Sequence, residues 1–571
     1  TEWARLVAEN QDGLVRVGGR WLEVERALVE ATARAWKSTE ALAREGLPLS
    51  HALAAVRSVG APEPGAPRVS YVAGAWLGEL LSAQKAGAQA DMDLGAELQA
   101  TLRPYQREGV AWLALMSEIG AGVCLADDMG LGKTLQVLAL ILRLRRRGIA
   151  GPHLLVVPAS LIGNWREEIA AHTPTLSTAV VHHTHAETAI DRADLVLTSY
   201  ATLVRQPALL AREWPLVVLD EAQTIKNPAA KQTVAIKKLQ GRMRIALTGT
   251  PVENHLGELW SIFDFLDPGL LGPAKAFKRQ TRALGAAPKQ TIESLRTVVR
   301  PFILRRMKTD PNVIRDLPEK VEVPVFCGLT SLQARLYAQV VHGLETDMKD
   351  TDGIRRKGQI LAALVHFKQI CNHPAQYLKS GEYTPEQSAK FIRLRALCAP
   401  IAERRERALV FTQFQEMTRP LATFLATVFG RDGLVLAGNT PVARRARLVA
   451  DFQHEDGPPF MVLTLKVGGT GLNLTSASHV IHFDRWWNPA AENQASDRAF
   501  RIGQTRNVMV HKFVCRGTLE QRIDELLRIK QTLADDILCE SDTPQITEFG
   551  TAELLGIVRL DSAEADDRGD A

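Results

Sequence analysis

Short apolar runs alternate with segments of helical periodicity between about residues 100 and 250. The runs are GVCLA (122–126), HLLVVP (153–158), DLVLTS (194–199), PLVVLDEA (215–222) and RIALTG (244–249). Nearly continuous apolar runs are typical of strands that are buried on both faces, and helices between them are typical of crossover connections. The pattern therefore predicts an α/β lobe with a parallel sheet.

A second series of the same kind begins near residue 408. Its apolar runs are ALVFTQF (408–414), GLVLAG (433–438), FMVLTL (460–465), HVIHFD (479–484) and VMVHKFV (508–514). The stretch between the two series, about residues 270–380, is helix-rich and carries RRMK (305–308). We therefore predict an α/β chain with two parallel-sheet lobes and helical material between them.

The first 95 residues or so form a separate region in this interpretation. VRVGGRWLEVE (15–25) alternates around two glycines, which predicts a hairpin. A helical segment follows it, and PEPGAP (62–67) is typical of a link. This region shows no chemistry, so packing or partner docking is its expected role. The last residues, LDSAEADDRGDA (560–571), have the composition of a disordered tail.

Composition narrows the class of protein only a little. The chain has 571 residues, which predicts several domains, and a net charge of +5, which permits a nucleic-acid partner without demanding one.

The six widely spaced cysteines of the chain favour a reducing compartment. Cys371 and His373 have the spacing of half a metal site, but we favour core residues because no second pair lies nearby. No membrane span is expected. The chain starts at Thr1, so its native start is expected to lie upstream.

LADDMGLGKT (125–134) resembles a phosphate-binding loop, G-x-x-x-x-G-K-[ST], in which Asp127 replaces the first glycine. An apolar strand precedes it and an apolar helix follows, as that loop requires. Gly130 and Gly132 let the backbone approach phosphate closely. Lys133 is predicted to pair with the β- and γ-phosphates, and the Thr134 hydroxyl to ligate Mg²⁺.

Two further features support a nucleotide site. LVVLDEAQ (216–223) places Asp220 and Glu221 at the end of an apolar strand, where Asp220 would hold Mg²⁺ and Glu221 would polarise the attacking water. The competing interpretation is a solvated acidic turn. Upstream, Gln106 offers an amide that can bond both the N6 donor and the N7 acceptor of adenine. A glutamine on a helix surface is by itself no signal.

These pieces lie within an ordered series of motifs. The others are LLVVPASLIGNW (154–165), LTSYATL (197–203), LTGTPVEN (247–254), PFILRRMKTD (301–310), KQICNHP (368–374), LVFTQF (409–414), KVGGTGLNLTSASHVIHFDRWWNP (466–489) and ENQASDRAFRIGQ (492–504). Over residues 97 to 540 the chain resembles the Swi/Snf family, the DNA-translocating branch of the helicase-like ATPases, in its bacterial and archaeal members. The first 95 residues match an accessory segment of some bacterial members less closely.

The resemblance implies an architecture and explains the missing glycine. It implies two RecA-like lobes with helical protrusions: an N-terminal accessory region (1–95), a first lobe (96–300) with a protrusion from about 260, a linker and second protrusion (301–388), a second lobe (389–545) and a polar tail (546–571). Family members often read D-x-M-G-L-G-K-T, so Asp127 fits them. The chain departs from many relatives at Gln223 and Phe500, where they have histidine.

The resemblance also implies roles for particular residues. ATP would be bound by Gln106, Asp128, Met129, Gly130, Leu131, Gly132, Lys133, Thr134, Gln223 and Gly469, and Mg²⁺ by Thr134 and Asp220. Lys133, Asp220 and Glu221 would act in catalysis with two arginine fingers, Arg498 and Arg501. DNA contacts would come from Ser160, Asn164, Thr198, Ser199, Thr412, Gln413, Lys466, Gly469, Thr470, Asn473 and Trp486. Arg305, Arg306 and Lys308 would link the lobes or reach DNA, with a solvated helix face as the alternative.

The function so implied is an ATP-dependent translocase on double-stranded DNA that remodels protein–DNA complexes without stable strand separation. The alternatives are a strand-separating RNA or DNA helicase, and a nucleotide-gated clamp or RNA polymerase-associated scaffold. The expected cofactors are ATP and Mg²⁺. The expected partners are duplex DNA, held mainly by phosphate contacts, and DNA-bound proteins or RNA polymerase. A monomeric, cytoplasmic, nucleoid-associated motor with no membrane contact is expected.

Overall fold

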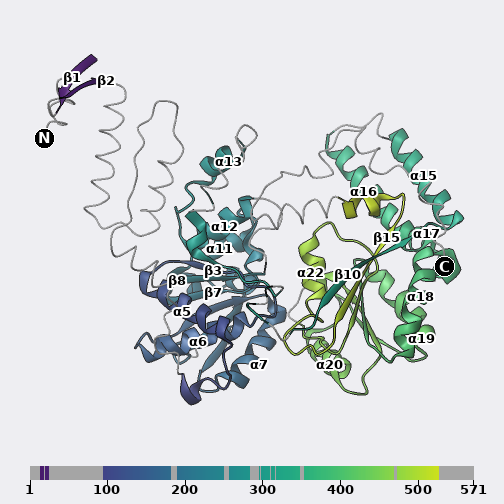
Figure 1. The fold of residues 1–571 in the computed structure, drawn as a ribbon, viewed down its shortest axis with the longest axis horizontal. Helices are drawn as coiled ribbons and strands as arrows, with labels where there is room; N and C mark the ends of the chain where they lie inside the picture. The colour runs from purple at the N-terminus through teal and green to yellow at the C-terminus, as the bar shows by residue number, and fades with distance from the viewer. Residues whose placement is uncertain are drawn as a thin grey trace. The chain divides into compact units, whose positions relative to one another are not determined.

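A computed structural model describes residues 13–17, 20–24, 94–181, 190–249, 256–282, 298–308, 317–347, 353–468 and 472–525, together with residues 295, 310 and 312–314. The chain divides into two compact units (Figure 1). The first unit comprises residues 1–127 and 132–306, and the second comprises residues 128–131 and 307–571.

The first unit contains a seven-stranded parallel sheet in the order β5-β6-β4-β7-β8-β3-β9. Its strands are β3 (Val123–Leu125), β4 (His153–Val157), β5 (Thr178–Val181), β6 (Leu195–Ser199), β7 (Glu213–Leu219), β8 (Gln240–Leu247) and β9 (Ile303–Leu304). All five apolar runs of the first series are strands of this sheet, as predicted.

Helices connect these strands. They are α5 (Pro104–Ile119), α6 (Lys133–Arg146), α7 (Ile162–His172), α9 (Tyr200–Val204), α10 (Pro207–Ala211), α11 (Lys231–Ile236), α12 (Leu256–Leu266) and α13 (Ala274–Arg282), with 3₁₀ turns η1 (Gly95–Glu97), η2 (Ala159–Leu161), η3 (Ala222–Ile225) and η5 (Arg300–Phe302). Local sequence sets their ends. Helix α5, for example, has proline in its first turn and a capping box formed by Arg103 and Gln106, and it ends at Gly120, whose φ is +73°.

The second unit contains a six-stranded parallel sheet in the order β10-β15-β14-β11-β13-β12. Its strands are β10 (Lys320–Cys327), β11 (Ala408–Thr412), β12 (Leu434–Leu436), β13 (Phe460–Thr464), β14 (His479–His482) and β15 (Val508–Cys515). All five runs of the second series are strands of this sheet. The prediction of two parallel-sheet lobes is therefore confirmed.

Helices also surround the second sheet. They are α15 (Ser331–Asp347), α16 (Gly353–Asn372), α17 (Pro374–Leu378), α18 (Ala389–Glu403), α19 (Thr418–Phe429), α20 (Val442–Gln453), α21 (Leu465–Gly468) and α22 (Pro489–Ser496), with 3₁₀ turns η6 (Pro385–Gln387) and η7 (Gln415–Met417). The stretch 301–388, predicted as linker and helices, also supplies β9 to the first sheet and β10 to the second.

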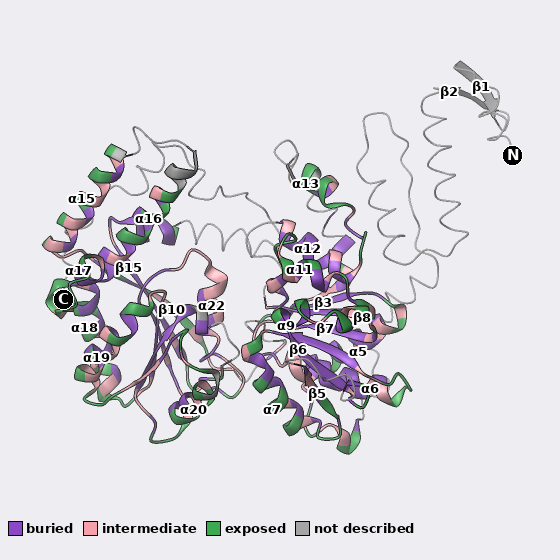
Figure 2. Cartoon of the chain, turned by 180° about the vertical axis from the view of Figure 1, so that it is seen from behind, coloured by how far each residue is buried: buried purple, intermediate pink, exposed green. Residues whose placement is uncertain are grey.

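The central strands are buried on both faces, which accounts for their continuous apolar sequences. In β11, Ala408 and Val410 pack in one hydrophobic cluster, whereas Leu409 and Phe411 pack in another. Figure 2 shows the same burial along the strands of both sheets. None of the helices in the described part of the chain has the length and apolarity to span a membrane.

The N-terminal hairpin is present. Strands β1 (Gly13–Val17) and β2 (Arg20–Val24) pair antiparallel, with Val17 opposite Arg20 across the two glycines. The helical segment, the PEPGAP link and the polar tail predicted from the sequence lie outside the described residues.

Candidate functional site

The phosphate loop lies between β3 and α6, and Lys133 is the first residue of that helix. Gly130 and Gly132 have φ angles of +83° and +75°, a backbone region that disfavours any side chain. Leu131 is buried, while Asp128, Met129 and Thr134 are half-buried. The Lys133 ammonium donates to the carbonyl oxygen of Asp127 at 2.5 Å. A loop with this backbone, a lysine and a helix N-terminus fits a polyphosphate group.

Asp220 follows the last residue of β7, and three groups hold it. The Trp165 indole N–H donates to Oδ2 at 2.8 Å, and the backbone N–H of Glu221 donates to Oδ1 at 2.9 Å. The Tyr200 hydroxyl donates to the Asp220 carbonyl at 2.6 Å. Burial, together with the nearby charge of Glu221, raises the pKa of Asp220 to about 6, while the Trp165 hydrogen bond opposes the shift. A carboxylate that is costly to charge in this way fits a bound cation.

Glu221 has a left-handed backbone, with φ +50° and ψ +53°. Non-glycine residues in this region are uncommon and carry strain, and such positions cluster at functional sites. Gln223, the residue that replaces histidine, connects two motifs. Its Nε2 donates to Glu221 Oε2 at 2.5 Å, and its Oε1 accepts from the Thr248 hydroxyl at 3.0 Å. The amide therefore fixes the predicted catalytic carboxylate without needing a charge.

Gln106, the predicted adenine contact, is buried and has a structural role at the start of α5. Its Oε1 accepts the backbone N–H of Arg103 at 2.9 Å, as part of the cap of α5. A side chain at Gly132 would meet Gln106 Nε2 at 2.3 Å. The amide thus lies directly against the phosphate loop. Its part in reading adenine stays a prediction.

The predicted DNA contacts of the first unit fall into two groups. Thr198 has no exposed surface and its hydroxyl donates to the Val181 carbonyl at 3.1 Å, while the Ser199 hydroxyl caps α9. Both hydroxyls therefore have partners within the protein, and their contact with DNA stays a prediction. Ser160 is half-buried and Asn164 is exposed, so these two have the accessibility that the prediction requires.

In the second unit, polar groups gather where β11 and β13 end. Thr412 and Thr464 are in register on these adjacent strands. The Thr412 hydroxyl, a predicted DNA contact, is buried and donates to Asp484 Oδ2 at 2.6 Å. Gln413 Nε2 and the Thr464 hydroxyl are buried atoms with no hydrogen-bond partner among the described residues. Gln413 and Thr464 thus lie directly after and at the carboxyl ends of two adjacent parallel strands.

The remaining predicted DNA contacts of the second unit, apart from Trp486, show less of their surroundings. Asn473 is exposed, and Lys466 belongs to α21. The Lys466 side chain lies outside the described residues, as do Gly469 and Thr470.

The tryptophan motif rests on a buried ionic network. Arg485 donates to both oxygens of Glu492, at 3.1 and 3.2 Å, and Glu492 accepts the backbone N–H of Trp486 at 2.7 Å. Lys368 of α16 donates to the Arg485 carbonyl at 2.8 Å, and its ammonium lies 4.8 Å from the Trp487 ring centroid. Both tryptophans are half-buried, so the network fixes a pair of indoles that keep accessible surface.

The two predicted arginine fingers flank Phe500. Arg498 is buried and Arg501 is half-buried. The Lys308 ammonium donates to the Phe500 carbonyl at 2.6 Å and lies 5.1 Å from its ring centroid. Burial lowers the pKa of Lys308 to about 8, while Asp497 opposes the shift. The structure thus excludes the solvated-face alternative for Lys308, and for the buried Arg306 as well, whereas Arg305 is exposed.

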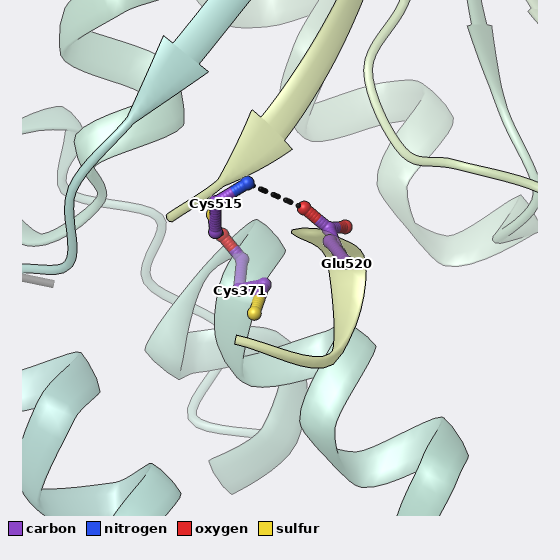
Figure 3. Close-up of side chains that lie close together, drawn as sticks. All are labelled: Cys371, Cys515 and Glu520. Atoms are coloured by element: carbon purple, nitrogen blue, oxygen red, sulfur yellow. Dashed lines mark hydrogen bonds between the residues drawn. The ribbon is translucent and has the colours of Figure 1, made fainter. Parts of the chain in front are cut away.

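A buried thiol pair resembles a metal site by distance alone. The ligand atoms of Cys371, Cys515 and Glu520 lie within 4.8 Å of one another (Figure 3). Burial raises the pKa of the Cys515 thiol well above its usual range. Both Glu520 oxygens are engaged, one by Lys390 at 2.6 Å and the other by the Cys515 backbone N–H at 3.1 Å. A protonated Cys515 thiol and an already paired carboxylate are poor metal ligands, so this cluster belongs to the core.

The Cys371 and His373 pair predicted from sequence is equally committed to the fold. His373 Nδ1 accepts the backbone N–H of Ala375 at 3.0 Å, and its Nε2 lies 2.9 Å from the Thr384 carbonyl oxygen. Both ring nitrogens therefore have partners within the protein.

Three residues of interest were missed by sequence reasoning. They are Trp165, which bonds Asp220, Thr464, with its unpaired hydroxyl, and the side chain of Asp127, which we had treated only as a marker of the family. Trp165 lies in the motif LLVVPASLIGNW and Thr464 lies in the apolar run FMVLTL. Neither position by itself indicates which hydrogen bonds the side chain makes.

Comparisons with known proteins agree with this arrangement. Residues 105–376 match the SNF2-related domain, and residues 389–503 match the helicase conserved C-terminal domain. The putative ATP-dependent helicase/translocase YwqA of Bacillus subtilis is 40% identical over 98% of this chain and 62% of its own length. The Zorya protein ZorD of Escherichia coli is 36% identical over 82% of this chain and 47% of its own length. The chain therefore spans about half to three fifths of these relatives.

Among solved structures, the Sulfolobus solfataricus SWI2/SNF2 ATPase core in complex with dsDNA is 42% identical. The match covers 81% of this chain and 98% of that one, with a TM-score of 0.41. The two matched domains together account for most of the chain, in the order in which its two parallel-sheet lobes occur. The chain belongs to the SNF2 family of helicase-like ATPases.

Proposed function

We propose that this chain is an ATP-dependent motor that translocates on double-stranded DNA and remodels or displaces protein–DNA complexes. The observation that carries the DNA part is the placement of two uncharged polar side chains, Gln413 and Thr464, at the carboxyl ends of the adjacent parallel strands β11 and β13. Uncharged donors at the carboxyl ends of parallel strands suit phosphate oxygens. They also fit a chain whose net charge is only +5.

In the nucleotide half, Lys133 and the loop amides would hold the phosphates, and Thr134 and Asp220 would hold Mg²⁺. The cation, when bound, neutralises charge on the phosphate oxygens. Glu221 would accept a proton from the attacking water, with Gln223 fixing its carboxylate. The Lys133 ammonium, which bonds the Asp127 carbonyl in this structure, would turn to the β- and γ-phosphates.

Arg498 and Arg501 would stabilise charge on the γ-phosphate, which is worth a factor of about 10³ to 10⁵ in rate for arginine fingers elsewhere. A catalytic group on each lobe would make hydrolysis depend on closure of the lobes. Turnover would then drive movement along the duplex.

The test compares ATP hydrolysis with and without duplex DNA and pairs it with displacement of a triplex-forming strand, which reports movement without unwinding. We expect stimulation by duplex, triplex displacement by the native protein, and neither activity in Glu221→Gln. Equal hydrolysis rates with and without DNA would refute the proposal. Binding should weaken steeply with salt, because phosphate contacts release counterions.

A strand-separating helicase is the second candidate, since the name of the Bacillus subtilis relative includes both helicase and translocase. Robust displacement of one strand of a plain duplex would favour it. A nucleotide-gated clamp or a scaffold on RNA polymerase is the third candidate. Retention of biological activity in Glu221→Gln would favour that role, because binding without hydrolysis would then suffice.

A further inference from the structure

Asp127 occupies the position at which the general phosphate-loop pattern has glycine, and its carboxylate has no exposed surface. Arg306 donates to it twice, from Nε to Oδ1 at 2.9 Å and from Nη2 to Oδ2 at 2.5 Å. Gln136 Nε2 donates to Oδ2 at 3.1 Å, and Gln136 Oε1 accepts from Arg306 Nη2 at 2.7 Å. The three side chains therefore form a closed, buried triangle.

The triangle joins four parts of the first unit. Asp127 begins the phosphate loop, Gln136 lies in the first turns of α6, and Arg306 is the second residue after β9. Arg306 also donates to the Tyr105 carbonyl and lies 5.1 Å from that ring's centroid, which connects the group to α5. Strand β9 itself pairs with β3, which leads into the loop.

Helix α5 has a glycine, Gly109, where its backbone packs against this triangle. A methyl group at Gly109 would lie 1.9 Å from Gln136 Oε1 and 2.7 Å from Arg306 Nη2. Glycine at this helical position costs roughly 0.5–1 kcal/mol relative to alanine. The close approach of the cluster to the helix backbone accounts for its presence.

Fixing the Asp127 side chain also fixes its carbonyl oxygen, which accepts the Lys133 ammonium at 2.5 Å. A buried carboxylate must stay paired, because an unpaired charge is costly in the interior. Any displacement of Asp127 would therefore break the triangle and move the anchor of Lys133. The loop gains through these bonds a rigidity that glycine at this position would not provide.

We propose that Asp127 and Arg306 are positioning residues for nucleotide binding, which hold the backbone of the phosphate loop in the geometry that ATP requires. Arg306 is also the last residue of the first unit, so the chain is anchored to the phosphate loop where it passes into the second. The inference depends on the ATP site alone and not on the proposed movement along DNA.

The test measures ATP hydrolysis and binding of a fluorescent ATP analogue by the full chain, well below the melting temperature of each variant. Asp127→Asn keeps the shape of the side chain and removes its charge. Arg306→Lys keeps the positive charge and removes the bidentate pair of hydrogen bonds to the Asp127 carboxylate. We expect each change to raise KM for ATP, and Kd for the analogue, by about 10- to 100-fold, the loss typical of a misplaced positioning group. We expect kcat at saturating ATP to fall by less than about threefold, because a positioning effect on substrate binding appears in KM.

The matched control is Asp264→Asn, which removes the carboxylate of the Asp264–Lys237 ion pair of the same unit. Lys237 precedes β8, so this pair lies at the amino ends of the parallel strands, whereas the phosphate loop follows the carboxyl end of β3. The control should lower stability without changing KM. If Asp127→Asn does not fold, Arg306→Lys decides the question by the same measurements.

A lower melting temperature with KM and Kd within about twofold of the native and control proteins would overturn the proposal, because the triangle would then serve stability alone. Failure of DNA to stimulate hydrolysis, together with a raised KM in the variants, would refute the DNA motor and leave the positioning role intact. The two inferences therefore fail separately.

Discussion

The hydrogen bond from Trp165 to Asp220 should set the acid limit of ATP hydrolysis. Burial has already raised the pKa of Asp220 to about 6, and the indole N–H, at 2.8 Å from Oδ2, favours the charged carboxylate and so limits that rise. Trp165→Phe keeps an aromatic ring in this buried position and removes the donor. The pKa of Asp220 should therefore rise further.

The size of the shift follows from the hydrogen bond. A hydrogen bond to a charged group contributes about 1.5–3 kcal/mol. One pKa unit corresponds to about 1.4 kcal/mol, so the loss is equivalent to roughly one to two pH units. The charged carboxylate, which would hold Mg²⁺, is present above the pKa and is lost as pH falls through it. Removing the donor should consequently move the acid limb upward by that amount.

The assay is the Mg²⁺ concentration that gives half-maximal ATPase activity, measured between about pH 6 and pH 9. Protons and Mg²⁺ compete for the carboxylate, so this concentration should rise about tenfold per pH unit below the pKa. It should begin to rise at higher pH in Trp165→Phe than in the native protein. Trp214→Phe is the control, because Trp214 is also buried in the first unit but donates to the Leu209 carbonyl, at 3.0 Å. Coincident pH profiles for native protein and Trp165→Phe would refute the reasoning.

Three further predictions concern turnover and stability. Glu221→Gln should keep ATP binding and lower kcat by about 10²- to 10⁴-fold, as loss of a general base does, and single-turnover hydrolysis at the native rate would contradict this. Lys390→Met should destabilise the second unit by about 3–5 kcal/mol in calorimetry, because it leaves Glu520 buried without its ammonium partner. The double variant Lys390→Met/Glu520→Gln should recover part of this loss. Equal melting temperatures of the single and the double variant would contradict the mechanism. Gly109→Ala should lower the melting temperature through its clash with Gln136, and an unchanged transition would show that α5 can move aside.

The central strands of both sheets were predictable because burial on two faces leaves an unbroken apolar run. Three of the four edge strands lack that signal; the fourth, β12, lies in the apolar run GLVLAG. Strand β10 alternates polar and apolar residues and carries Pro324, β5 has four residues, and β9 has two. Strand β9 lies in the stretch predicted as linker, yet it belongs to the first sheet.

The backbone conformation of the phosphate loop was predictable because its causes are local. Gly130, Gly132 and Lys133 are consecutive or nearly so, and two of them need the positive φ angles that the structure has. The surroundings of the predicted DNA contacts could not be read from the sequence. Thr198 and Thr412 lie in the expected motifs, but the structure shows that their hydroxyls bond within the protein.

The sequence by itself determined the two-lobe α/β class, the family and the phosphate loop, because strand burial, glycine conformation and a lysine at a helix start are properties of neighbouring residues. Only the tertiary structure decided what Asp127 does. Its partner, Arg306, lies 179 residues away and reaches it because β9 adds to the sheet beside β3. A buried charge needs a partner in space, and sequence proximity does not supply one.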